Sequence, residues 1–143
     1  IRNKFSTRPW QHVLEPLSGY LLLGEKLLSN KVEYSKSYNF GPSTEEDFTV
    51  EALAPKIMSY WSDVKIKFGT DPHSPHEAGL LKLDCALAKK DLKWTASLSI
   101  KDALSMTVDW YKQYYETTKM LTEKDILNYV SLAVKRNAIW ATK

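Results

Sequence analysis

A short stretch near the start of the chain, Arg8–Leu17, joins a proline-containing turn to a strongly apolar helix. From Val13 onward leucines recur at helical spacing, and Leu22 and Leu23 widen the apolar stripe until it covers most of the circumference. A helix of this kind is expected to be buried on more than one side. The stretch therefore predicts a buried helix that begins near Val13 and ends near Asn30.

Segments with strand character follow this helix. The first of them ends at Gly41–Pro42, a turn signal, and the second alternates apolar and polar residues. The predicted strands are residues 34–40, 64–68 and 80–83. Together with the helices they predict a mixed fold, α/β or α+β.

Two helices are predicted in the middle of the chain. The first has Pro55 inside its apolar pattern, so either a kink or a start near Ala54 is expected. Asp84 is the predicted cap of the second, a short helix over residues 85–92. Two pairs are candidates to cap a turn before the first helix: Ser43 with Glu46, and Thr44 with Asp47.

Two more helices are predicted in the last third of the chain. Ser99 is a good N-cap, and Asp102 stands at the third position after it. Thr122 and Asp125 repeat this pattern before the last helix. The predicted apolar face of that helix consists of Ile126, Leu127, Val130, Ala133 and Val134.

Charge and composition narrow the class of protein. The 20 Lys and Arg residues are scattered among 17 Asp and Glu residues and form no basic run typical of nucleic-acid binding. No apolar run approaches the roughly 20 residues that span a bilayer, and no secretory leader is seen. Cys85 is the single cysteine, which fits a reducing, cytoplasmic location. Because the chain begins at Ile1, it is expected to be a piece of a longer protein.

Motifs of well-known chemistry are missing. The sequence has no Gly-rich phosphate loop, no Gly-x-Ser-x-Gly elbow and no cysteine pair at zinc spacing. His73, His76 and Glu77 lie in a proline-flanked loop without the i, i+4 register of helical zinc sites, so a metal site is not favoured. Two interpretations stay open: His76 and Glu77 orient a polar ligand, or the loop is ordinary surface.

Other aromatic and reactive side chains are better explained by packing. Tyr111, Tyr114 and Tyr115 have a helical spacing typical of core and boundary aromatics, with a stacking platform as the alternative. His12 is predicted to be a structural histidine and Cys85 a small buried residue.

Arg8 is the main candidate for ligand binding. A guanidinium presents a rigid fork of donors that suits phosphate oxygens. An Arg-Pro-Trp turn is, however, more often structural than ligand-binding. Taken one by one, the residues predict an α/β fragment without a complete active site.

Three sequence blocks are more informative when they are read together. The first is 8–23, followed by Tyr38-Asn-Phe-Gly-Pro42; the second is 75–78 with 81–85; the third is Trp94 with 98–111. Together they resemble the C-terminal part of the extended short-chain dehydrogenase/reductases that act on nucleotide sugars. The first block is typical of the 4,6-dehydratases specific for CDP-glucose. The resemblance covers nearly the whole chain, with residues 118–143 as a poorly matched helical tail.

The resemblance implies that residues 1–143 form one substrate-binding lobe and that the Rossmann lobe is absent. In the family the N-terminal lobe carries the Gly-rich NAD turn and the catalytic Tyr and Lys, so no catalytic, cofactor-binding or metal-binding residue is expected here. Tightly bound NAD takes hydride from C4 of the glucose and returns it to C6 after water is lost. The product, CDP-4-keto-6-deoxyglucose, is used for surface polysaccharides.

The resemblance also implies roles for particular residues. Arg8 would grip the diphosphate of CDP-glucose, His76 would lie in a loop over the same end of the ligand, and Arg2 is a further candidate from the preceding segment. The chain alone is expected to be inactive and to bind neither nucleic acid nor membranes. It is expected to pair with the missing lobe, or with itself through the face around Leu21–Leu23 as a homo-oligomer. Two alternatives are an epimerase of the same family and a non-catalytic interaction module.

Two departures from the family pattern stand out. Lys93 replaces a Gly that usually precedes the Trp. Gly there serves a left-handed helix exit, so Lys is expected to cost about 1 kcal/mol if the conformation is kept. An Arg that many relatives place near Ser74 is also missing.

Overall fold

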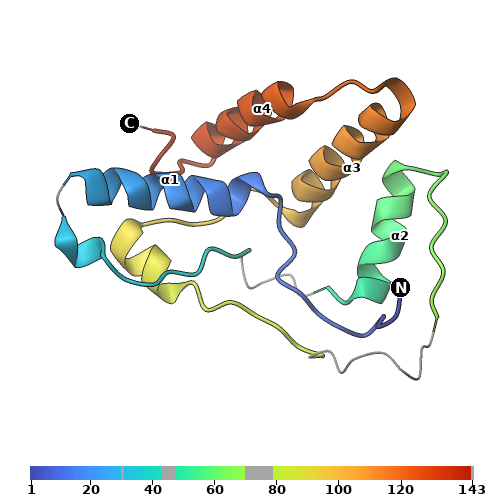
Figure 1. Cartoon of the computed structure of the whole chain (residues 1–143), viewed down its shortest axis with the longest axis horizontal. Helices are drawn as coiled ribbons and strands as arrows, with labels where there is room; N and C mark the ends of the chain where they lie inside the picture. The colour runs from blue at the N-terminus through green and yellow to red at the C-terminus, as the bar shows by residue number, and fades with distance from the viewer. Residues whose placement is uncertain (30, 43–47, 70–78, 143) are drawn as a thin grey trace.

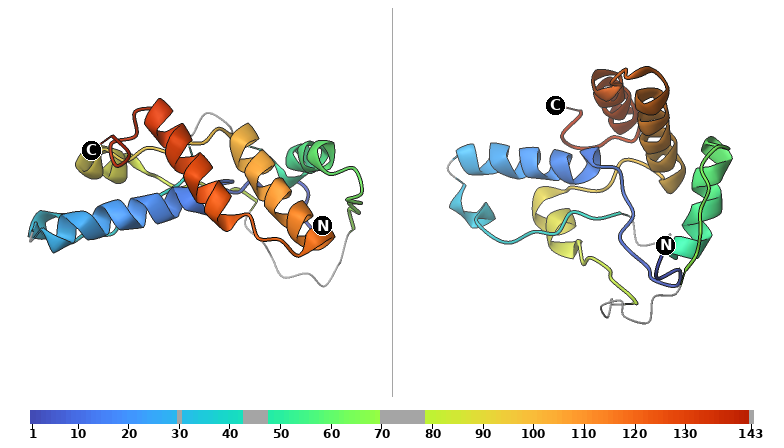
Figure 2. Two further views of the ribbon diagram at one scale, coloured as in Figure 1. Left: turned by 90° about the horizontal axis from the view of Figure 1, so that it is seen from above. Right: turned by 45° about the vertical axis from the view of Figure 1, so that its right-hand side comes forward.

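The computed structural model describes residues 1–29, 31–42, 48–69 and 79–142. Their regular elements are α1 (Leu14–Leu28), η1 (Val32–Tyr34), α2 (Val50–Tyr60), η2 (Ala88–Leu92), α3 (Ile100–Thr117) and α4 (Thr122–Lys135). Of the two short elements, η1 is a 3-10 turn and η2 a π-helical turn. In Figure 1 α1 lies along one side of the molecule, and α2 lies at the opposite end. Figure 2 shows α3 and α4 turned back on each other as a helical hairpin. None of the described helices is long and apolar enough to cross a membrane.

The predicted strands do not form within the described part of the chain. Residues 34–40, 64–68 and 80–83 contain no β-ladder. Pairing of the β type there is limited to isolated bridges from Thr7, antiparallel to Thr49 and parallel to Leu80. A strand needs a partner along several residues to pair its N–H and C=O groups, and the described residues offer these segments none. The described structure is therefore helical, and the mixed α/β prediction is not confirmed.

α1 confirms the first predicted helix but not its burial. It begins at Leu14, one residue after the predicted start, and its predicted end at Asn30 lies outside the described residues. Leu22 is buried, whereas Leu21 and Leu28 are 77% and 87% exposed. The prediction that this helix is buried on more than one side is wrong, because the core packs against one flank only.

The core lies between α1, η2 and the segment that leads to Gly41. Phe40 and Trp94 are buried there with their rings 5.0 Å apart in an edge-to-face arrangement. Gly19 lets the Phe40 ring sit directly on α1, because a Cβ at Gly19 would lie 2.3 Å from the ring. The buried cluster consists of Leu22, Phe40, Ala88, Leu92 and Trp94.

α2 begins at Val50 and contains Pro55, as in the predicted helix with this proline inside its apolar pattern. Thr49 is its N-cap, with the side-chain oxygen accepting the N–H of Ala52, and the helix continues through Pro55. The prediction of a start near Ala54 is wrong, because Pro55 removes a single N–H and the cap at Thr49 supports the turns before it. The two predicted capping pairs between 43 and 47 lie outside the described residues. α2 packs against α3.

The short helix before Trp94 ends as the family pattern predicted. Asp84 caps it by accepting the N–H of Ala86 at 2.8 Å. Lys93 follows η2 with φ 57° and ψ 22°, the left-handed conformation that favours glycine. The lysine therefore adopts the strained helix exit that was expected of this position.

The two C-terminal helices differ in how well their starts were predicted. The capping box of Ser99 and Asp102 at α3 is confirmed. At α4 the residue before the helix is Leu121 and no side chain caps it, so the predicted cap is wrong. Thr122 is instead the first helical residue, and its hydroxyl accepts the indole N–H of Trp110 at 3.0 Å.

The buried face of α4 also differs from the prediction. Asp125, Tyr129 and Ala133 point inward at successive turns. Most of the predicted apolar face is exposed, including Leu127 at 66% and Ile126 at 44%. The sequence pattern failed because the packed face contains an acid and a tyrosine, which a count of apolar residues does not select.

Candidate functional site

Thr7, the residue before Arg8, connects the N-terminal segment to two other segments of the chain. The N–H of Thr7 donates to the carbonyl of Gly79 at 2.8 Å, and Thr7 forms the bridges to Leu80 and Thr49. The Arg8 side chain is half-buried, and its guanidinium donates to the carbonyl of Thr7 at 2.8 Å. Arg8 is thus held where the first and second sequence blocks meet.

The residues after Arg8 are fixed by hydrogen bonds to the segment before α2. The indole N–H of Trp10 donates to the carbonyl of Phe48 at 2.8 Å. The side-chain amide of Gln11 donates to the carbonyl of Phe40 at 2.9 Å. These contacts explain why an Arg-Pro-Trp-Gln turn is followed in sequence by an Asn-Phe-Gly-Pro element: the two pack as one unit.

Arg2 lies in the N-terminal segment that leads to Arg8. The N-terminal ammonium of Ile1 donates to the carbonyl of Lys67, and the N–H of Gly69 donates to the carbonyl of Ile1. Arg2 is exposed in this segment. His76 lies outside the described residues, which resume at Gly79, the partner of Thr7. Both flanks of 70–78 are therefore bonded to the segment that carries the two predicted arginines.

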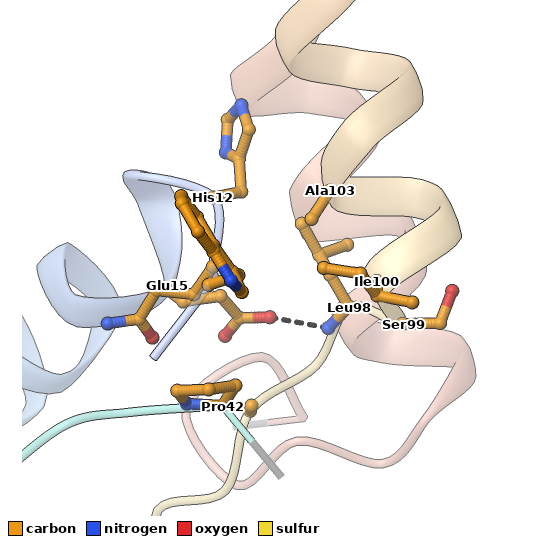
Figure 3. A pocket seen from close by; sticks show the side chains of 10 residues that line it. His12, Glu15, Pro42, Leu98, Ser99, Ile100 and Ala103 are labelled. Carbon is orange, nitrogen blue, oxygen red and sulfur yellow. Dashed lines mark hydrogen bonds between the residues drawn. The ribbon is translucent and has the colours of Figure 1, made fainter. Parts of the chain in front are cut away.

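Glu15 is a buried carboxylate that the sequence did not single out. It is 1% exposed, and one of its oxygens accepts the backbone N–H groups of both Ser97, at 2.8 Å, and Leu98 (the latter bond is drawn in Figure 3). The hydroxyl of Tyr129 donates to its other oxygen at 3.0 Å. Burial raises the pKa of Glu15, and these hydrogen bonds oppose the rise. The available signal was a glutamate one residue inside a predicted apolar helix.

Ser18 extends this polar network into the aromatic core. Its hydroxyl donates to the backbone carbonyl of Glu15 at 2.7 Å and accepts the indole N–H of Trp94 at 2.9 Å. The Tyr129 hydroxyl lies 2.9 Å from the same oxygen. Burial raises the pKa of Tyr129, so it remains a donor. The network joins α1, α4 and the segment before α3, and both oxygens of Glu15 accept hydrogen bonds within it.

A cavity of about 220 Å³ lies beside Glu15 (Figure 3). Its walls come from the turn before α1, from Pro42 and from residues 96–103. His12 lines it and, as predicted, is structural: its Nδ1 accepts the N–H of Leu14 at 3.3 Å. Burial lowers the pKa of His12, so the ring is neutral near pH 7.

A neighbouring cavity of about 470 Å³ shares Pro42 and Ala96 with the first. Cys85 lines it, against Gly41, and burial raises the pKa of this thiol. A raised pKa disfavours the thiolate, and Cys85 is only partly buried, whereas a buried residue was predicted. Gly41 is needed at this contact, because a Cβ there would lie 3.1 Å from Leu83 and 3.2 Å from the sulfur.

The residues of this chain do not fit NAD. Its glycines are at 19, 24, 41, 69 and 79, so no two of them make a Gly-x-Gly turn. Tyr115 and Lys119 have the Tyr-x-x-x-Lys spacing, but α3 ends between them, with Thr118 at φ 58°. The two side chains are therefore not on successive turns of one helix. Within the described ranges no group of three His, Cys, Asp or Glu residues is placed to hold a metal ion.

The predicted boundary tyrosines of α3 are more exposed than expected. Tyr111, Tyr114 and Tyr115 are 50%, 38% and 70% exposed. Trp110 stacks on Tyr114 at 5.4 Å, and Tyr111 on Tyr115 at 6.5 Å. These rings pack mainly on one another, because consecutive turns of one helix bring them together, and they form a surface stack.

Comparison with known proteins agrees with the three sequence blocks. No protein-family model matches the chain. The chain is similar to a CDP-glucose 4,6-dehydratase of Salmonella typhimurium (strain LT2), with 37% identity over 137 residues. The alignment covers 94% of this chain and 38% of that enzyme. The chain thus spans well under half the length of this relative, and the resemblance predicted from the sequence blocks is confirmed.

Proposed function

We propose that this chain is the substrate-binding part of a nucleotide-sugar 4,6-dehydratase that converts CDP-glucose to CDP-4-keto-6-deoxyglucose. The observation that carries the proposal is the 37% identity to the Salmonella enzyme along 94% of this chain. NAD would be held by the N-terminal part of such an enzyme, so the chain alone is inactive. A cytoplasmic location and a role in surface polysaccharide synthesis belong to the same proposal.

Arg8 is the proposed diphosphate-binding residue. The residue before it, Thr7, bridges to Thr49 and Leu80, which fixes the backbone at the start of the Arg-Pro-Trp turn. A fixed backbone limits the freedom that a guanidinium loses when it binds two phosphate oxygens. Arg2 and His76 are proposed to act on the same end of the ligand, because both flanks of 70–78 are bonded to the N-terminal segment.

Calorimetric titration of the chain with CDP, UDP and dTDP tests this proposal. CDP is expected to bind most tightly, and Arg8→Ala is expected to weaken it at least tenfold because a charge-assisted bidentate contact is lost. Lys65→Ala, at an exposed position, is the control and should leave the affinity unchanged. The titration is repeated with the remainder of the Salmonella enzyme added. Equal affinity for all three nucleotides in both settings would contradict the assignment to CDP-glucose.

The exposed side of α1 is proposed to need a partner. Leu17, Tyr20, Leu21 and Leu28 are between 43% and 87% exposed on this helix. In the whole enzyme the N-terminal lobe would cover them; alone, the chain is expected to self-associate through this face. Light scattering should show a mass that rises with concentration, and Leu21→Gln should reduce the rise. A monomer across a wide concentration range would count against this proposal.

A further inference from the structure

A third cavity borders the turn that precedes α1. It measures about 440 Å³, within the size range of small-molecule sites. Three elements form it: the turn before α1, the middle of α3 and the first turn of α4. Its lining residues are Gln11, His12, Val13, Leu14, Thr107, Trp110, Tyr111, Thr122 and Asp125.

Asp125 is the unusual member of this lining. The residue is 7% exposed, and no hydrogen bond reaches its carboxylate from the residues that the structure describes, although its oxygens are not fully enclosed. Buried carboxylates are ordinarily paired or hydrogen-bonded, because removing a charge from water is costly. The nearest charged groups are Lys124 and Asp109, of opposite effect, and neither lines the cavity.

Gln11 contributes a second unpaired acceptor. Its amide nitrogen is used by the carbonyl of Phe40, and its side-chain oxygen is buried without a donor. The amide oxygen of Gln11 is enclosed, so the polar group that the cavity presents is the carboxylate of Asp125. No Lys or Arg is among its lining residues, and His12 is held neutral by burial. The lining lacks a positive charge to balance Asp125.

An aromatic wall completes the cavity. The indole N–H of Trp110 is held by the hydroxyl of Thr122 at 3.0 Å, which fixes the ring, and Tyr111 meets it edge-on at 5.2 Å. A cation next to a carboxylate and over an aromatic face gains from both contacts. We propose that this cavity binds an organic cation, a guanidinium or alkylammonium group, between Asp125 and Trp110. This inference does not rest on the proposed function.

Nuclear magnetic resonance titration of the whole chain tests the proposal. The probes are n-butylguanidinium and n-butylammonium, with 1-pentanol and pentanoate as neutral and anionic probes of similar size. Saturable shifts of the Trp110 indole and the Thr122 and Asp125 amides are expected with the two cations only. Trp110→Phe assigns the indole signal.

Two matched variants separate a site from non-specific attraction. Asp125→Asn keeps the shape of the side chain and should weaken cation binding at least tenfold. Asp109→Asn removes an exposed carboxylate on α3 that does not line the cavity, and it should change binding less than twofold. Equal losses in both variants, equal binding of 1-pentanol, or no saturation by either cation would overturn the proposal.

One further arm identifies the source of the cation. Nα-acetylarginine methylamide presents the same guanidinium on a peptide backbone. If it binds more tightly than n-butylguanidinium, the cavity receives an arginine side chain of another polypeptide. If it binds equally or less tightly, the cavity receives a free small cation.

Discussion

Two buried carboxylates in this molecule, Glu15 and Asp125, have opposite surroundings. Burial raises the pKa of each. Glu15 is met by the N–H groups of Ser97 and Leu98 and by a tyrosine hydroxyl. Asp125 faces a cavity with no donor to its oxygens from the described residues.

The difference separates structural acids from candidate binding groups. A carboxylate whose lone pairs are already used holds its neighbours in place and has little left for a ligand. One that is buried but unpaired keeps its capacity for a cation at a cost to the folded state. The comparison predicts that removing Glu15 destabilises the fold, whereas neutralising Asp125 does not.

The largest expected effect is that of Glu15→Ala. The substitution leaves the backbone N–H groups of Ser97 and Leu98 without their carboxylate acceptor and removes one of the two acceptors of the Tyr129 hydroxyl, so a loss of roughly 3 to 5 kcal/mol of unfolding free energy is expected. Glu15→Gln keeps one acceptor oxygen and should lose less. Urea unfolding measures both, with exposed Glu116→Ala on α3 as the control. A loss below 1 kcal/mol would remove the contrast with Asp125.

Ser18→Ala probes the same network one step further from the charge. It leaves the Trp94 indole N–H buried without an acceptor, for an expected loss of about 2 kcal/mol. Trp94→Phe in the Ser18→Ala background removes the orphaned donor. If the network argument holds, the two changes are non-additive in a double-mutant cycle of unfolding free energies.

Lys93→Gly should stabilise the folded protein by relieving backbone strain at the end of η2. The lysine has φ 57°, so glycine is expected to add about 1 kcal/mol of unfolding free energy. Lys93→Ala is the matched control and should add nothing comparable, because alanine also has a Cβ. Hydrogen exchange of the Trp94 indole should slow in the glycine variant. Equal gains for glycine and alanine would show that the charge, rather than the backbone, is responsible.

Asp125→Asn has the smallest expected effect on stability, and its sign is opposite to that of Glu15→Ala. Because the folded pKa of Asp125 lies above its unfolded value, the folded state binds more protons between the two, and stability falls as pH rises through that window. At pH 7 the variant should gain about 0.5 kcal/mol, and the gain should vanish as the pH falls below the window. Urea unfolding at several pH values measures this, with Asp109→Asn as control.

The sequence predicted helices better than the faces they bury. The helix after Val13 and the Ser99–Asp102 cap follow from local chemistry, which a sequence displays directly, whereas the left-handed Lys93 was predicted from the family pattern. The prediction of strands failed because the pairing of strands depends on distant segments of the chain. The described residues provide only the bridges at Thr7. The predicted buried face of α4 was wrong because Asp125 and Tyr129 occupy the face that packs against the rest of the protein.

The candidate site was only partly predictable. Arg8 came from a short motif and a family resemblance, and in the structure it directly follows Thr7, which bridges to Thr49 and Leu80. Glu15 and Asp125 were not singled out as site residues, because a lone carboxylate in an apolar helix carries no spacing signal of its own. Their roles depend on donors that lie 82 to 114 residues away for Glu15 and on a cavity wall from α3 for Asp125.

The contact between Gly19 and Phe40 has a consequence for natural variation. A side chain at position 19 would overlap the ring at position 40, and the ring is itself wedged against Trp94. The two positions are therefore expected to change together among homologous sequences, with a larger residue at 19 accompanied by a smaller one at 40. Such covariation would indicate that the Leu-rich helix and the Asn-Phe-Gly-Pro element evolve together as one packed unit.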